Sequence, residues 1–204
     1  MPSIGVHLRV GYEVEQATEL VLNRRLFYLG ILAPDVTMIT GVKPLEEPVD
    51  SHFRELDVRL WKFRILQFYD DMKKQYPVDY CFGYLVHLLT DLFFDDKFYW
   101  ELRTSLTMDG FPVQKQAKKV WDELIAYDRS QSTTSWFLKI VRELKKDSAV
   151  TLPFGVTMEE MERYQYYLLS EYFQNSERIE STLITHAIVS ELSDFVIEAV
   201  LDLH

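Results

Sequence analysis

The stretch that most constrains the fold is Tyr80–Phe94, which reads Tyr-Cys-Phe-Gly-Tyr-Leu-Val-His-Leu-Leu-Thr-Asp-Leu-Phe-Phe. Its side chains are apolar nearly all round, which predicts a helix buried on every side. It nevertheless carries His87 and Asp91, whose spacing places both on one helix face about 6 Å apart. An ionised carboxylate is costly there unless it is paired or binds a metal. The pair therefore indicates a metal site or a buried His–Asp interaction, and the residues alone leave both open.

The rest of the chain predicts further helices around this one. Of 204 residues, 48% are apolar and only seven are glycine and seven proline, which favours long helices over a turn-rich sheet protein. Apolar periodicity and its breaks predict helices over residues 4–23, 24–33, 54–75, 78–106, 113–127, 136–146, 158–175 and 180–203. We expect an all-α fold, a single-domain multi-helix bundle of about seven helices over residues 1–204, because no linker or repeat divides the chain.

Charge and cysteine content limit the partners and the compartment. A net charge of −10 disfavours a nucleic-acid groove or an anionic membrane surface as main partner. A small phosphate ester stays compatible, because bound cations reverse the local field. The single cysteine, Cys81, excludes a disulfide within the chain and favours a reducing compartment. With neither a signal-peptide pattern nor a transmembrane segment in the sequence, we expect a cytoplasmic protein.

The irregular segment 36–53 is bounded by two possible metal ligands. Asp35 directly follows Pro34, so its carboxylate is either a turn or cap residue or a ligand held on a rigid turn. The segment is 18 residues long, and loops of this length in compact domains are often functional or disordered. At the far end, Ser51 is expected to cap the next helix, which would place His52 in its first turn.

A further histidine lies near the start of the chain. His7 falls close to the buried stripe of the first predicted helix, with Gly11 one turn on. Its ring is either a metal ligand or a core histidine that is hydrogen-bonded to a carbonyl. Gly11 leaves room for a metal or for close helix contact. Imidazole nitrogen together with carboxylate oxygen suits zinc, and iron or manganese also fits. The candidate metal ligands are His7, Asp35, His52, His87 and Asp91.

These residues occur in an order that resembles a known superfamily. The matching pieces are His7, then Leu29–Asp35, then Lys43 with Ser51–Phe53, and last Gly83–Asp91. In this order they resemble the zinc-dependent phospholipase C and single-strand-specific zinc nuclease superfamily, and within it a group of short bacterial proteins. The resemblance covers about residues 1–100.

The resemblance implies an all-α fold that hydrolyses phosphate ester bonds with one or two zinc ions. Asp35, His52, His87 and Asp91 would hold one zinc, and His7 would help to hold a second, with Asp91 bridging the two. Asp35 and Asp91 are then the catalytic candidates, Asp35 also as general base. The implied substrate is a small phosphodiester, such as a nucleotide or a phospholipid head group. Two-metal sites stabilise both the attacking and the leaving oxygen of such a reaction.

Three positions depart from the superfamily's pattern. Met1 stands where secreted members have a metal-binding N-terminal tryptophan, and Lys97 replaces a histidine. His186 is followed four residues later by Ser190 instead of a carboxylate. A third metal site is therefore expected to be absent or rebuilt, with Asp95–Asp96 either supplying oxygen ligands or serving as solvated helix-end charges.

Two other functions fit the same residues. A non-catalytic relative would keep a structural metal site, or lose it, and act as a binding or interaction protein. A metal-free helical interaction module would use the aromatic segment Tyr164–Phe173 as a partner surface, unless its tyrosines are core residues. The sequence indicates neither the oligomeric state nor the substrate.

Overall fold

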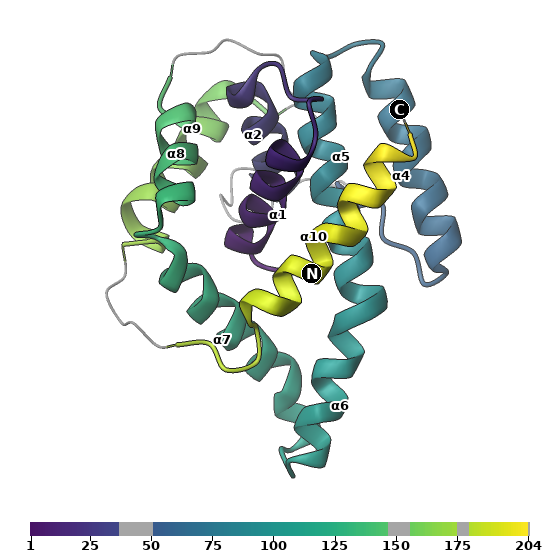
Figure 1. The fold of residues 1–204 in the computed structure, drawn as a ribbon, viewed down its shortest axis with the longest axis vertical. Helices are drawn as coiled ribbons and strands as arrows, with labels where there is room; N and C mark the ends of the chain where they lie inside the picture. Colours follow the sequence, from purple (N-terminus) through teal and green to yellow (C-terminus); the bar gives the residue numbers. More distant parts are fainter. Residues whose placement is uncertain (37–50, 147–155, 175–179, 204) are drawn as a thin grey trace.

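The computed structural model describes residues 1–36, 51–146, 156–174 and 180–203. Within these ranges the chain forms helices and no strand, which confirms the all-α prediction. In the numbering of Figure 1 the elements are α1 Ile4–Ala17, α2 Arg24–Leu32, the 3-10 turn η1 Ala33–Asp35, α4 Val58–Met72, α5 Val78–Phe93, the π-helix η2 Phe94–Tyr99, α6 Trp100–Met108, α7 Val113–Gln131, α8 Ser135–Leu144, α9 Met158–Tyr167, the π-helix η4 Leu168–Tyr172 and α10 His186–Leu201.

Helix α5 is the centre of the arrangement. It packs against α1, α2, α4 and α10, and its side chains from Tyr80 to Leu92 are all buried. In Figure 1, α4 lies on one side of α5 and α10 crosses the front, while α8 and α9 stand on the far side of α1 and α2. Beyond η2 the chain continues as α6, which pairs with α7 in a hairpin that extends away from the other helices. The burial of α5 confirms the prediction that the helix around His87 is buried on every side.

Helices α2 and α5 cross in backbone contact, because each presents a glycine to the other. A Cβ added at Gly30 would lie 2.1 Å from the carbonyl oxygen of Tyr80, and one at Gly83 would lie 1.9 Å from that of Phe27. Only residues without a side chain permit this approach. The crossing brings the end of α2, and the turn that follows it, against the middle of α5.

Several helix ends differ from the sequence-based prediction. Helix α1 ends at Ala17 and not at residue 23, because Thr18 is extended and both its amide and its hydroxyl bond to the Val14 carbonyl. Helix α7 runs to Gln131, past its predicted end at 127. The predicted break near Asp95–Asp96 is the π-helix η2, through which the chain stays helical. No described helix is both long enough and apolar enough to span a membrane.

The prediction that Ser51 caps the next helix is wrong. That helix, α4, starts at Val58, and its cap is Asp57, whose carboxylate accepts from the amides of Arg59 and Leu60. Most of the predicted loop 36–53 lies outside the described residues. Ser51 is buried and makes other bonds, described below.

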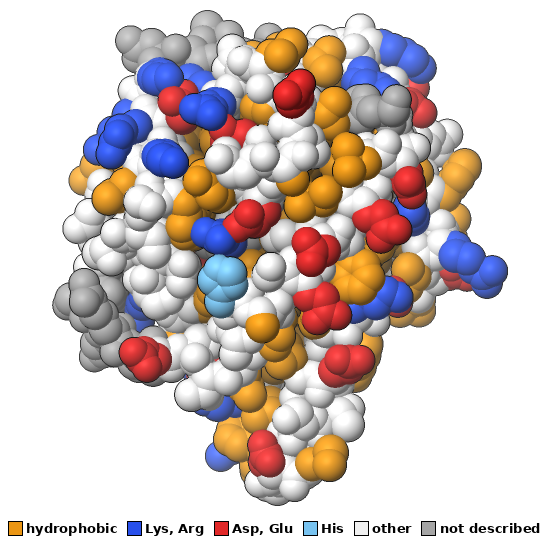
Figure 2. Space-filling view, in the orientation of Figure 1, with side chains coloured by type: hydrophobic (Ala, Val, Ile, Leu, Met, Phe, Trp, Pro, Cys, Tyr) orange, Lys and Arg blue, Asp and Glu red, His pale blue; other side chains and the backbone are white. Residues whose placement is uncertain are grey.

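The aromatic segment near the end of the chain turns some of its side chains to the interior and Tyr166 to solvent. Tyr164, Leu168 and Phe173 are buried, whereas Tyr166 is 67% exposed. On the face seen in Figure 2, hydrophobic side chains are interspersed with acidic and basic ones. Histidine forms only a small patch on that face, in keeping with the burial of His7, His52 and His87.

Candidate metal centre

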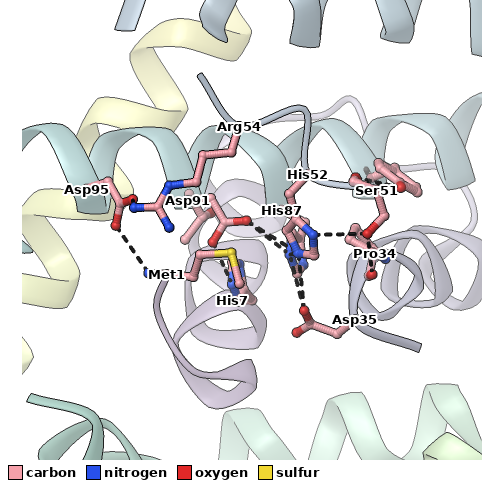
Figure 3. Close-up of polar contacts among 12 residues, drawn as sticks. Met1, His7, Pro34, Asp35, Ser51, His52, Arg54, His87, Asp91 and Asp95 are labelled. Atoms are coloured by element: carbon pink, nitrogen blue, oxygen red, sulfur yellow. Dashed lines mark hydrogen bonds and ion pairs between the residues drawn. The ribbon is translucent and has the colours of Figure 1, made fainter. Parts of the chain in front are cut away.

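The structure brings together the five predicted ligands from four separate segments. His7 lies on α1, Asp35 on η1 and His52 on the turn before α4, while α5 supplies His87 and Asp91. Figure 3 shows these side chains pointing toward one another on one side of α5. They form two groups of three, Asp35 with His52 and His87, and His7 with His87 and Asp91, and in each group the ligand atoms lie within 4.8 Å of one another. His87 belongs to both groups.

The Asp35 group lies on the more open side. Asp35 Oδ1 is 3.2 Å from His52 Nε2 and 3.9 Å from His87 Nε2, and the two Nε2 atoms are 3.3 Å apart. The Asp35 side chain is 15% exposed and that of His52 is 9% exposed. These atoms surround a small space with two nitrogens and one oxygen, an arrangement that suits zinc and similar ions.

The His7 group is enclosed. The rings of His7 and His87 stack 3.7 Å apart with an interplanar angle of 3°. Asp91 Oδ1 lies 3.5 Å from His7 Nε2, and its Oδ2 lies 3.4 Å from His87 Nε2 and 3.7 Å from His52 Nε2. The two oxygens of one carboxylate thus point to the two groups, which is the disposition that a bridging ligand requires.

Hydrogen bonds fix which ring nitrogens face the centre. His87 Nδ1 lies 2.8 Å from the carbonyl oxygen of Ile31, which can only accept, so Nδ1 carries the proton. Ser51 Oγ donates to the carbonyl oxygen of Pro34 at 3.0 Å and therefore accepts from His52 Nδ1, also at 3.0 Å. Both neutral rings then turn an Nε2 lone pair to the centre. Metal-binding histidines are oriented by such bonds from the other ring nitrogen.

Two lone pairs facing each other at 3.3 Å repel unless a proton or a metal ion lies between them. Other buried atoms of the site also lack a partner. His7 Nδ1 and both oxygens of Asp91 accept or donate no hydrogen bond within the described part of the chain. Buried polar groups are normally satisfied. The donor set, its tautomers and its unsatisfied oxygens therefore fit a divalent cation bound by nitrogen and oxygen.

The charges within the cluster support the same reading. Burial, together with the neighbouring His87, lowers the pKa of His7 to about 4, so this ring is neutral at pH 7. Burial alone would raise the pKa of Asp91, but His87 and His7 outweigh it, and the pKa lies well below its usual range. For His87 burial lowers the pKa, yet Asp35 and Asp91 reverse the shift and raise it. The centre thus favours a positive charge. A proton on His87 would supply it, and a bound metal ion would take the place of that proton.

Comparison with protein-family models, with curated proteins and with solved structures gives no match. The relationship to the phospholipase C and nuclease superfamily therefore stays a prediction. Lys43, one piece of that resemblance, lies outside the described residues. The chemistry of the site is judged from the geometry of its own residues.

The turn that carries His52 contains features that the sequence did not reveal. Phe53 has a φ of 53°, the one positive value at a non-glycine residue in the described ranges. Such a conformation costs on the order of 1–3 kcal/mol and is found mainly where the surroundings enforce it. Here Trp61 Nε1 donates to the carbonyl oxygen of His52, and the Tyr84 hydroxyl donates to that of Ser51, both at 2.9 Å.

The remaining candidates lie apart from the two groups. Asp95 bonds to Arg54 and, at 3.1 Å, to the amine of Met1, and Asp96 pairs with Lys97 at 2.7 Å. His186 is exposed and lies 3.4 Å from Arg9. Gly11 serves helix packing, since a Cβ there would meet the Ile31 side chain at 2.2 Å. A rebuilt third site from Asp95, Asp96 or His186 therefore finds no support in the described residues.

Proposed function

We propose that this chain is a metal-dependent hydrolase of phosphate ester bonds. Its ligands would be His7, Asp35, His52, His87 and Asp91, holding one or two divalent ions, of which zinc fits the mixed nitrogen and oxygen donors. The observation that carries the proposal is the facing pair of His52 and His87 Nε2 atoms, 3.3 Å apart, with both Nδ1 atoms bonded elsewhere. Without a metal ion, this pair would need a proton on one of the two Nε2 atoms.

Because His87 turns only its Nε2 lone pair to the centre, it could bind one ion, and a second ion would be held by His7 and Asp91. Asp91 turns one oxygen to His7 and the other to His87, so it supports a bridging role. Paired divalent ions supply Lewis acids for a phosphoryl oxygen and an ionisable water near neutral pH. This chemistry is the reason for preferring phosphate ester hydrolysis, and the ordered motifs of the first hundred residues agree with it.

The chain's own residues determine where a substrate would enter. His7, His87 and Asp91 are at most 1% exposed, whereas the Asp35 side chain is 15% exposed. A small phosphodiester or a phospholipid head group would therefore approach from the Asp35 side. Burial alone would raise the pKa of Asp35, but the neighbouring His87, His7 and His52 outweigh it and the pKa is lowered. Asp35 is thus ionised at neutral pH and able to accept a proton from an attacking water.

One observation favours a second candidate function. The complete burial of His87 and Asp91, with His7 stacked beside them, is also what a closed structural metal site shows. In that case the ion would hold α1 and η1 against α5 and catalyse nothing. The chain would then be a binding or interaction protein.

The deciding experiment measures metal content and hydrolysis on the same preparation. Purified protein is dialysed, analysed for metals, stripped with a chelator and reloaded with zinc. We expect one to two ions per chain, and hydrolysis of bis(4-nitrophenyl) phosphate that disappears on stripping and returns on reloading. Asp91→Asn keeps the side-chain volume but removes the charge, so it should lose both metal and activity.

The matched control is His186→Ala, which removes an exposed histidine outside both groups and should change neither result. Metal uptake that raises the melting temperature without any hydrolysis would favour the structural alternative. A stripped protein that takes up no zinc, cobalt, iron or manganese would overturn both candidates. Equal behaviour of the Asp91 and His186 variants would show that bound metal sits elsewhere.

A further inference from the structure

The first turn of α1 is held by a carboxylate from another helix. Ser3, the residue at the cap position of α1, makes no side-chain capping bond of its own. Instead, Asp128 of α7 accepts from the Gly5 amide through Oδ2 at 2.9 Å and from the Ser3 hydroxyl through Oδ1 at 2.7 Å. Helix starts need such an acceptor because their first amides have no partner within the helix. Here it comes from a residue far along the chain.

Asp128 also ties α1 to a third segment. The Tyr172 hydroxyl donates to Asp128 Oδ2 at 2.8 Å, so η4 joins the same carboxylate. Asp128 is fully buried. A Cβ added at Gly5 would lie 2.3 Å from Asp128 Oδ1, so the carboxylate occupies the space that any other residue at position 5 would fill. The start of α1 is thereby fixed against α7 and η4.

This fixed start determines where His7 lies. The His7 amide makes an early bond of the helix, to the Ser3 carbonyl at 3.2 Å, so His7 sits on the turn that Asp128 holds. Its ring makes no hydrogen bond through Nδ1 within the described residues. The ring's place is therefore set by the helix, by stacking on His87 and by Asp91 Oδ1, which lies 3.5 Å from Nε2. Helix α1 supplies His7 to one ligand group and nothing to the other.

We propose that Asp128 is a positioning residue for the metal group formed by His7, His87 and Asp91, a role that rests on the metal-binding function proposed above. Without its carboxylate the first turn of α1 loses its acceptors, and His7 is no longer held over His87. The group formed by Asp35, His52 and His87 receives no residue from α1, so it keeps its geometry. Loss of Asp128 should therefore weaken metal binding at the group that contains His7 and leave the group that contains Asp35 unchanged.

Helix α7 carries its own matched control. Glu123 is likewise buried, and its carboxylate accepts from the Ser181 hydroxyl and the Leu183 amide, both at 2.9 Å. These bonds hold the segment that leads into α10, which supplies no ligand to either group. Glu123→Gln therefore removes a comparable carboxylate from the same helix. It should destabilise the fold without removing an acceptor from the first turn of α1, the helix against which α10 packs.

The test compares Asp128→Asn with Glu123→Gln by two measurements. The first is cobalt(II) titration of the stripped protein, followed by absorbance. We expect two equivalents for the wild-type protein and for Glu123→Gln. For Asp128→Asn the second equivalent should bind about 10- to 100-fold more weakly, the usual effect of losing a group that supports a ligand. The second measurement is the NMR spectrum of ¹⁵N-labelled histidine rings without metal, in which the His7 signals should shift in Asp128→Asn alone.

The outcomes separate this proposal from the one it rests on. Unchanged His7 ring signals in Asp128→Asn, or equal shifts in Glu123→Gln, would overturn the role of Asp128. If the wild-type protein binds no cobalt, the metal function fails, and if it binds only one equivalent, there is no second site to weaken. In both cases the ring spectra of the metal-free proteins still decide whether Asp128 places His7. Should Asp128→Asn not fold, Tyr172→Phe removes one of the hydroxyl donors to the same carboxylate. It should shift the His7 signals in the same direction by a smaller amount.

Discussion

The close crossing of α2 and α5 makes Gly83→Ala the sharpest test of how this fold builds its site. The added Cβ would lie 1.9 Å from the carbonyl oxygen of Phe27, 2.9 Å from its carbonyl carbon and 3.0 Å from the Ile31 nitrogen. All three are backbone atoms, so no side-chain rotation relieves the overlap. To restore an ordinary contact of about 3.4 Å, the helices must separate by about 1.5 Å at this point.

The separation has two consequences of different size. Overpacking in a well-packed core costs about 1–3 kcal/mol, and an overlap with backbone belongs at the upper end, so we expect a loss of about 3 kcal/mol in the free energy of unfolding. The bond from His87 Nδ1 to the Ile31 carbonyl, now 2.8 Å, lies one turn from Gly83. A shift of this size breaks it and frees the ring to turn. Metal affinity should then fall by about 10- to 100-fold.

Urea unfolding of the metal-free protein measures the first effect, and zinc titration measures the second. Gly110→Ala is the matched control, because Gly110 has a φ of 75° and a Cβ added there would meet no other atom within 4 Å. Its cost should be only the left-handed backbone strain of about 1–2 kcal/mol, with metal affinity unchanged. A Gly83→Ala protein within about 1 kcal/mol of wild type and with normal zinc affinity would refute the reasoning.

Two further predictions concern buried titratable groups. The pKa of Glu123 is lowered from 4.5 to about 2, because hydrogen bonds from Lys119 and the backbone outweigh burial. The stabilisation from this carboxylate is therefore present above pH 4.5 and lost as pH falls from 4.5 toward 2. Acid unfolding of Glu123→Gln should therefore lack this part of the pH dependence, and an unchanged profile would contradict it. Burial raises the pKa of Cys81 to about 11, so iodoacetamide at pH 8 should alkylate it only after unfolding. Mass spectrometry measures the alkylation, and rapid modification of the native protein would contradict this prediction.

The sequence predicts the parts of this structure that depend on local periodicity. The run around His87 is buried on every side because apolar residues surround the helix, and the pairing of His87 with Asp91 follows from one helical turn. The capping box of Thr157 and Glu160 likewise joins residues three apart in the chain. In each case the residues that interact are neighbours along a helix, so spacing alone contains the information.

Convergence of distant segments cannot be derived in this way. Nothing in the spacing of Asp35 and His52 places them 3.2 Å apart. Their residue types group them as possible metal ligands, and only the resemblance to a known superfamily predicts that they share one ion. Ser51 resembles a helix cap in sequence, yet its hydroxyl bonds to Pro34, a contact made by a turn whose Phe53 has a positive φ. Asp128 lies just past the predicted end of its helix, so its bond to Gly5 has no local signal in the sequence.

Gly30 and Gly83 affect both the packing of the core and the orientation of His87. The segment Leu29–Asp35 contains Gly30 and ends in a candidate ligand, and Gly83–Asp91 begins with a glycine and carries two candidate ligands. Because both glycines lie at the same crossing, one close backbone contact packs α2 on α5 and also puts the Ile31 carbonyl 2.8 Å from His87 Nδ1. That bond fixes the tautomer and turns Nε2 to the centre. A change that loosens the crossing therefore alters the ligand before it exposes the core, so metal affinity should respond to milder substitutions than stability does.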